Sequence, residues 1–296
     1  MNTKKYFNYI LFVAGILLLS LISCRERIDI NTSASPPRVV IYGYITTDTA
    51  QQAIRITRST GYFATTKPEG ISQATVSINS DDNEVFPLSE SPDDPGLYLT
   101  SPDVYGIPGK TYTLHATLDF YGDGKTEDYE ATSYLPFPAI LDSAAVTPSS
   151  IMDNFLQVLI WGTLPEESSN NFSFHLFRNG VAINDSLKGY QITQDTYITT
   201  KKIEALPAFL LNPDRDNEKL SLGDTLTVQV ESLTSDYATF IQNAQSELRG
   251  PIPFFGGPPA NVETNIICVS SGLSPGISGF FTAYSKSRTT MIYQGE

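Results

Sequence analysis

The chain has 296 residues, of which 41% are hydrophobic and 17% are charged, and this balance is typical of a globular protein rather than a disordered one. Its formal net charge of −13 argues against a nucleic-acid partner, because such binding depends on lysine and arginine side chains that neutralise phosphates. With 2 cysteines and 2 histidines, the chain has few ligands for a zinc site.

The first segment has the pattern of a bacterial lipoprotein leader. Lys4 and Lys5 precede an apolar stretch whose core, residues 10–22, is short for a membrane span. The stretch ends in Leu-Ile-Ser-Cys24, which resembles a lipobox, where the cysteine thiol accepts a diacylglyceryl group before cleavage. We predict a signal peptide over residues 1–23 and lipidation of Cys24, with acyl chains such as palmitate anchoring the protein. The alternative is an uncleaved anchor helix.

Two features follow from a lipidated Cys24. Residues 24–37, rich in Ser, Pro and charge, are predicted to be a tether between the lipid and the folded body. Cys268 is then left without a partner, so no intrachain disulfide is expected and the fold depends on burial. The apolar run "NIICVSS" around Cys268 predicts a buried strand with a packed, unreactive thiol.

From Arg38 onward the sequence is typical of β-structure. Short runs rich in Val, Ile, Thr, Tyr and Phe are separated by clusters of Gly, Pro, Asp and Asn. In "TYTLHATL" (111–118) apolar and polar residues alternate, which predicts a half-buried strand. Gly122 and Gly124 then predict a hairpin tip. Pro136 and Pro138 disfavour continuous strand pairing, so we place a domain boundary there and predict an immunoglobulin-like β-sandwich over 38–138.

The second half is predicted to be another β-sandwich, residues 139–296, that carries one helix. In "SDYATFIQNAQSELRG" apolar residues, including Tyr237, Phe240, Ile241 and Leu248, recur at helical spacing. This pattern predicts an amphipathic helix near 235–249, with Ser235 as its amino-terminal cap.

The order of these segments resembles a family of Bacteroidota outer-membrane lipoproteins, the domain-of-unknown-function 4249 family. The matching stretches are "VVIYGYIT", "GYF" (61–63), "ISQATVSI", "GLYLT", "PGKTYTLHATL", "YEATSYLPFPAILDS", "PPANVETNI" and "GFFTAY". The resemblance implies an immunoglobulin- or transthyretin-like β domain followed by a second β domain, without known catalytic residues. It also implies a role beside a TonB-dependent transporter, because genes of this kind often accompany such channels.

Two features of the sequence bear on an enzymatic function. "GLSPG" (272–276) matches the Gly-x-Ser-x-Gly pattern of a nucleophile elbow at Ser274, but the next residue is Pro275, which lacks the amide hydrogen that the oxyanion hole needs. His115 and His175 both precede the serine and lie in different predicted domains. We expect His115 to face solvent on a strand and His175 to be packed or at a rim, and we predict no catalytic residue and no enzyme activity.

Binding candidates are few. The acidic loops at 119–128 and 212–219 carry oxygen ligands at turn spacing, but solvated hairpin tips explain them better than calcium sites, and no metal or cofactor is predicted. The single tryptophan, Trp161, is expected to fill the core rather than to form a platform for sugars. Tyr62 and Phe63, in "TGYFATT", are the best candidates for an exposed contact with a partner.

Taken together, the sequence predicts a lipid-anchored binding protein of the outer membrane, facing the cell surface or the periplasm. Its expected role is an accessory of a TonB-dependent nutrient uptake complex, attached to the membrane through Cys24. The alternative is an adhesion or envelope-structural module without a transport partner, and a hydrolase is a more distant third. The sequence names no ligand.

Overall fold

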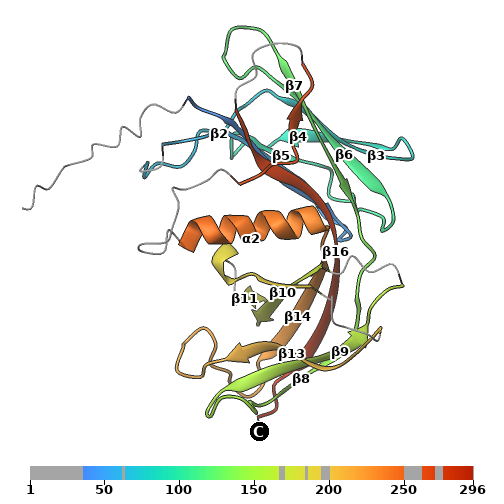
Figure 1. Ribbon diagram of the computed structural model, residues 1–296, viewed down its shortest axis with the longest axis vertical. Helices are drawn as coiled ribbons and strands as arrows, with labels where there is room; N and C mark the ends of the chain where they lie inside the picture. Colours follow the sequence, from blue (N-terminus) through green and yellow to red (C-terminus); the bar gives the residue numbers. More distant parts are fainter. Residues whose placement is uncertain are drawn as a thin grey trace, which may run out of the picture. The chain divides into compact units, whose positions relative to one another are not determined.

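A computed structural model describes residues 36–61, 64–166, 171–183, 186–194, 201–249, 262–270 and 276–295. Within these residues the chain is almost entirely β-structure with one α-helix, as predicted (Figure 1). The elements in chain order are β1 (Val39–Thr46), β2 (Ala53–Arg58), β3 (Thr75–Ser80), β4 (Val85–Glu90), β5 (Leu97–Leu99), β6 (Thr111–Leu118), β7 (Glu127–Tyr134), β8 (Ile140–Pro148), β9 (Leu156–Thr163), β10 (Asn171–Arg178), β11 (Val181–Ala182), the 3-10 helix η2 (Leu187–Gly189), β12 (Gln191–Gln194), β13 (Lys202–Leu211), β14 (Thr225–Ser232), α2 (Ser235–Arg249), β15 (Ile267–Cys268) and β16 (Ile277–Ile292).

The strands form two sheets. A 13-stranded sheet has the order β11-β10-β14-β16-β1-β2-β5-β4-β3-β6-β7-β15, with β12 paired to β10, and a 3-stranded sheet has the order β13-β9-β8. Among the described strands, all neighbouring pairs are antiparallel except β1 and β16, which run parallel from Val39↔Ile277 to Thr46↔Tyr284. A parallel pair needs a long connection, and here almost the whole chain lies between the two strands.

The first hydrophobic core is formed by the part of the large sheet that runs from β16 through β1 to β7. It is built mainly from inward-facing residues of β1, β2, β3, β6 and β7, with Phe281 and Ala283 of β16. The alternation predicted for β6 is confirmed, because Tyr112, Leu114 and Ala116 are all at most 1% exposed while the residues between them are half-buried. Every second residue of a strand points to the same face, so this pattern follows directly from the sequence.

The turn after β6 also forms as predicted. Gly122 and Gly124 have φ angles of +70° and +82°, the left-handed region that glycine adopts without strain. The carboxylate of Asp119 accepts backbone amide hydrogens of Gly122 (2.6 Å), Asp123 (3.2 Å) and Gly124 (2.8 Å), which closes the loop. This loop leads into β7, which pairs with β6 along its whole length.

The second hydrophobic core lies between the 3-stranded sheet and the β10–β14 part of the large sheet. Its fully buried residues include Val158 and Ile160 of β9, Leu176 of β10, and Leu226 and Val228 of β14. The expected burial of Trp161 in this core was wrong. Trp161 is only half-buried, since it points to the face of β9 opposite Val158 and Ile160.

Strand β16 joins both regions. Its first half pairs with β1, and its second half pairs with β14 from Ser285↔Ser232 to Ile292↔Thr225. Figure 1 shows this long strand, coloured red, continuing past α2. The 16 residues are long enough to contribute side chains to the first core and then to the sheet that covers the second.

The predicted boundary region, residues 135–139, packs against β14 and β16. Leu135 belongs to the first core and Ala139 to the second, the amide of Ala139 donates to Ser232 Oγ (3.2 Å), and Ser285 Oγ donates to the carbonyl of Pro136. The domain bounds 38–138 and 139–296 stay a prediction.

Helix α2 forms at the predicted residues, but two details differ. Thr234, not Ser235, caps its start, because Thr234 Oγ1 accepts the amide hydrogen of Tyr237 (3.3 Å). Leu248 does not join the buried stripe and is 48% exposed. Gln245 is buried instead, and its amide donates to the carbonyls of Leu187 and Tyr190, both at 2.8 Å. The buried stripe therefore continues through the polar Gln245, whereas periodicity predicted that it would continue through Leu248.

Candidate functional site

An aromatic cluster supports one side of α2. Tyr237 and Phe240 of the helix pack on Phe280 and Tyr284 of β16, with ring centroids 4.8–6.2 Å apart, and Tyr42 of β1 lies beside them. The hydroxyls of Tyr42 and Tyr237 are 2.7 Å apart and share a hydrogen bond. Burial raises the pKa of both Tyr237 and Tyr284 well above the usual value for tyrosine, so these groups stay protonated. The cluster is a rigid, neutral base for the helix.

A cleft of about 310 Å³ lies beside this cluster. One wall is the face of α2 formed by residues at positions i, i+3, i+4 and i+7, and the other wall is the segment 263–265. The lining residues are Asp236, Thr239, Phe240, Asn243, Glu263, Thr264, Asn265 and Phe280. Two phenyl rings, Phe240 and Phe280, 4.8 Å apart between centroids, form the apolar part of the cleft.

Some polar groups of the cleft are already used by the protein. Asn265 fixes the 263–265 wall, since its Oδ1 accepts the amide hydrogen of Phe281 (3.0 Å) and its Nδ2 donates to the Phe281 carbonyl (2.8 Å). Thr264 Oγ1 accepts the amide hydrogen of Ile266 (3.2 Å), and Thr239 Oγ1 donates to the Ser235 carbonyl (2.9 Å). These bonds hold the walls in place.

Three other polar side chains in the cleft are free. Asp236, Asn243 and Glu263 are exposed, and none has a side-chain hydrogen bond or ion pair with any residue in the part of the chain that the structure describes. The cleft therefore presents two carboxylates and one amide next to two aromatic rings. A small ligand with hydrogen-bond donors and an apolar portion fits such a lining.

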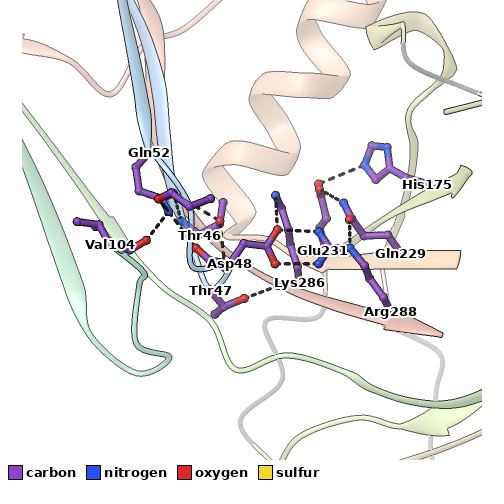
Figure 2. Close-up of polar contacts among 11 residues, drawn as sticks. Thr46, Thr47, Asp48, Gln52, Val104, His175, Gln229, Glu231, Lys286 and Arg288 are labelled. Carbon is purple, nitrogen blue, oxygen red and sulfur yellow. Dashed lines mark hydrogen bonds and ion pairs between the residues drawn. The ribbon is translucent and has the colours of Figure 1, made fainter. Parts of the chain in front are cut away.

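A second polar cluster lies where β1 turns into β2 (Figure 2). The Asp48 carboxylate receives two hydrogen bonds from the Arg288 guanidinium, at 2.8 and 2.6 Å, and lies 3.1 Å from Lys286 Nζ. These interactions lower the pKa of Asp48 from 3.8 to about 2, and the hydrogen bonds from Arg288 contribute most to the shift. Gln52 shapes the turn itself, accepting the Thr46 amide hydrogen at 3.0 Å.

The cluster continues into the protein as a chain of buried polar groups. Arg288 Nε donates to Gln229 Oε1 (2.7 Å), Gln229 Nε2 donates to Glu231 Oε1 (2.7 Å), and Glu231 Oε2 lies 3.2 Å from His175 Nε2. The same histidine nitrogen lies 3.0 Å from Ser173 Oγ. The chain links β16, β14 and β10 across neighbouring strands, and every member has a partner, so its evident effect is to stabilise the place where β16 passes from β1 to β14.

Comparison with known proteins identifies the family. A family model described as "Domain of unknown function (DUF4249)" matches residues 25–290. The chain belongs to this family. Among solved structures, the crystal structure of the chicken CNTN1 FN1–FN3 domains matches at 13% sequence identity and a TM-score of 0.25, covering 79% of this chain and 68% of that chain. None of the curated proteins matches.

Several predicted site residues of this DUF4249 chain lie outside the described residues. These are the lipidation site Cys24, the contact candidates Tyr62 and Phe63, and Ser274 with Pro275. Their predicted roles stay predictions. Within the described part of the chain, no helix is both long and apolar enough to cross a membrane.

The two histidines lie as expected for structural residues. His115 is on the half-exposed face of β6, with Nδ1 3.1 Å from Glu130 Oε1. His175 is 7% exposed and packed against the Tyr190 ring at a centroid distance of 4.6 Å. Cys268 differs from expectation, because its strand β15 has only two residues, Ile267 is 58% exposed, and the thiol is half-buried against the first core.

In each acidic loop, one carboxylate is occupied by groups of the same loop. Asp119 is occupied by three backbone amides, and in the other loop Glu218 accepts the Asn212 amide hydrogen (2.8 Å) and pairs with Arg215 (2.9 Å). No group of three or more potential metal-binding side chains occurs in the described ranges.

Sequence reasoning missed the cleft. The helix face with Asp236 and Asn243 was readable as a polar stripe at helical spacing, but Phe240 was assigned to the buried face. Nothing in the sequence indicated that Glu263, which follows α2 by 14 residues, would lie opposite Asp236.

Proposed function

We propose that this DUF4249 protein is a lipid-anchored binding protein of the outer membrane and an accessory of a TonB-dependent nutrient uptake complex. In this proposal Cys24 carries the lipid, and the β-structure holds a ligand site beside the channel. The family match begins at residue 25, directly after Cys24, as expected if residues 1–23 are a leader that is removed.

The observation that carries the proposal is the cleft along α2. It combines free polar groups, Asp236, Asn243 and Glu263, with the apolar rings of Phe240 and Phe280. This mixture is typical of sites that hold a small molecule by a few directed hydrogen bonds over an apolar surface. The walls of the cleft are fixed by α2 and by the Asn265 bonds to β16, which favours a preformed site.

The test is purification of the native lipidated protein from outer membranes in mild detergent, with mass spectrometry of what remains bound. We expect a stoichiometric TonB-dependent channel. A Cys24→Ser variant is the matched control, because it cannot accept the lipid and should be absent from the outer-membrane fraction. Asp93→Asn, at an exposed carboxylate in the described β4–β5 turn, should leave both attachment and channel binding unchanged.

Recovery of the protein from the membrane without a channel would overturn the transport role and favour an adhesion or envelope-structural module. If the intact mass of the native protein shows that residues 1–23 are retained and that Cys24 carries no lipid, the lipid anchor is wrong and the uncleaved helix replaces it. Activity on a panel of polysaccharides, abolished by a single acid substitution, would overturn the prediction that the protein is not an enzyme.

A further inference from the structure

We propose that the cleft between α2 and residues 263–265 binds an organic cation, an ammonium or guanidinium group on an aliphatic stem. This inference rests on the proposed binding function and specifies the chemistry of its ligand. It starts from a cavity of about 310 Å³, at the lower end of the range of roughly 300–1,000 Å³ typical of small-molecule sites.

The charge of the lining favours a cation. Among the described residues, the ionisable side chains that line the cleft are Asp236 and Glu263, two acids on opposite walls, and no described lysine or arginine lines it. Neither carboxylate has an ion-pair partner among the described residues, in contrast to Asp48, which is paired with both Lys286 and Arg288. A positively charged ligand would form the ion pairs that these two carboxylates lack.

The hydrogen-bonding groups favour a ligand rich in donors. Carboxylates only accept hydrogen bonds when ionised, and the donors of Thr239 and Asn265 are already used within the protein. An ammonium group has three N–H donors and a guanidinium group has five. Asn243 can add one acceptor through its amide oxygen and two donors through its amide nitrogen, so the preference for a donor-rich ligand comes from the two carboxylates.

The aromatic side of the cleft fits the rest of such a ligand. Phe240 is half-buried and presents part of its ring to the cleft, while Phe280, which is 4% exposed, packs against that ring at a centroid distance of 4.8 Å. A cation within about 6 Å of a phenyl ring is attracted by the ring's quadrupole. The methylene groups of the aliphatic stem are stabilised when contact with the ring removes their apolar surface from water. Lysine or arginine side chains of peptides and free polyamines share this chemistry.

The test is isothermal titration calorimetry on the full chain in mild detergent. The probes are spermidine, a trilysine peptide, the same peptide with acetylated amines, and a neutral oligosaccharide such as maltotriose. The variants are Asp236→Asn and Glu263→Gln, which remove one charge at nearly constant volume from exposed positions, and the control is Asp93→Asn, an exposed carboxylate outside the cleft. Far-ultraviolet circular dichroism confirms that each variant is folded.

We expect a cationic probe to bind the wild-type protein and the Asp93→Asn control equally, and each cleft variant roughly tenfold more weakly, as for the loss of one charge-assisted hydrogen bond. Binding of spermidine identifies free amines as the source, and binding of trilysine alone identifies peptides. If all three variants weaken cation binding equally, the proposed site is wrong, because the binding then reflects only the protein's overall negative charge.

Other outcomes separate this inference from the proposed function. If maltotriose binds and the cations do not, the cation inference is wrong while a binding function stands. If no probe binds but a channel is still recovered with the native protein, the cleft is not a cation site and the accessory role survives. If a cation binds at the cleft and no channel is recovered, the transport role fails alone.

Discussion

Replacing Asp48 by Asn should destabilise the protein by an amount that depends on pH. The pKa of Asp48 is lowered from 3.8 to about 2, chiefly by hydrogen bonds from Arg288. One pKa unit corresponds to about 1.4 kcal/mol, so a shift of nearly two units sets an upper value of about 2.5 kcal/mol. The Asp48 side chain is 30% exposed, and solvent screening reduces the expected loss at pH 7 to roughly 1–2 kcal/mol.

The sign of the pH dependence follows from the direction of the shift. A carboxylate whose pKa is lower in the folded state stabilises the protein above its unfolded pKa of about 3.9, and this contribution disappears as the pH falls through the folded value of about 2. The stability difference between wild type and Asp48→Asn should therefore be constant from pH 7 to about pH 5 and fall to roughly half by pH 3.

The assay is urea-induced unfolding followed by intrinsic fluorescence, at several values from pH 7 to pH 3. The Asp93→Asn variant is the control, since Asp93 is exposed and has no side-chain partner among the described residues. It should change the free energy of unfolding by less than about 0.5 kcal/mol at each pH. The reasoning would be refuted if Asp48→Asn lowered the free energy of unfolding by no more than the control does. It would also be refuted if a larger loss did not shrink toward pH 3.

Two further substitutions test the first core and the pairing of β1 with β16. Gly279→Ala should lower the free energy of unfolding by about 1–3 kcal/mol from backbone conformation alone, because Gly279 has a φ of +102°. An added Cβ would also lie 2.0 Å from the Ile41 carbonyl oxygen, which adds a steric clash. Gly124→Ala, at φ +82° but with open space around it, controls for conformation without the clash and should cost less in thermal unfolding. Phe281→Ala should cost about 3–5 kcal/mol by urea unfolding, because Phe281 is fully buried, whereas Tyr121→Ala, at a residue 55% exposed, should change stability by less than about 0.5 kcal/mol. Equal losses within either pair would contradict the packing described for that pair.

The local structure was largely predictable because it depends on neighbours in the sequence. Alternating residues in 111–118 predicted β6, glycines 122 and 124 predicted the turn that follows, and helical spacing predicted α2. These signals arise from the two-residue period of strands and the 3.6-residue period of helices. The errors arose where a long-range contact overrode the local pattern. At Leu248, periodicity predicted burial, but Gln245 is buried instead through hydrogen bonds to Leu187 and Tyr190.

By itself, the sequence determined the β-rich class of the fold, the helix α2 and the family to which the chain belongs. Only the tertiary structure decided which distant segments meet. Strand β16 pairs in parallel with β1, more than 230 residues away, and this pairing together with Asn265 places Glu263 opposite Asp236 across the cleft. The physical reason is that strand pairing and cleft geometry depend on long-range hydrogen bonds and core packing, whereas periodicity records only which face of an element is apolar.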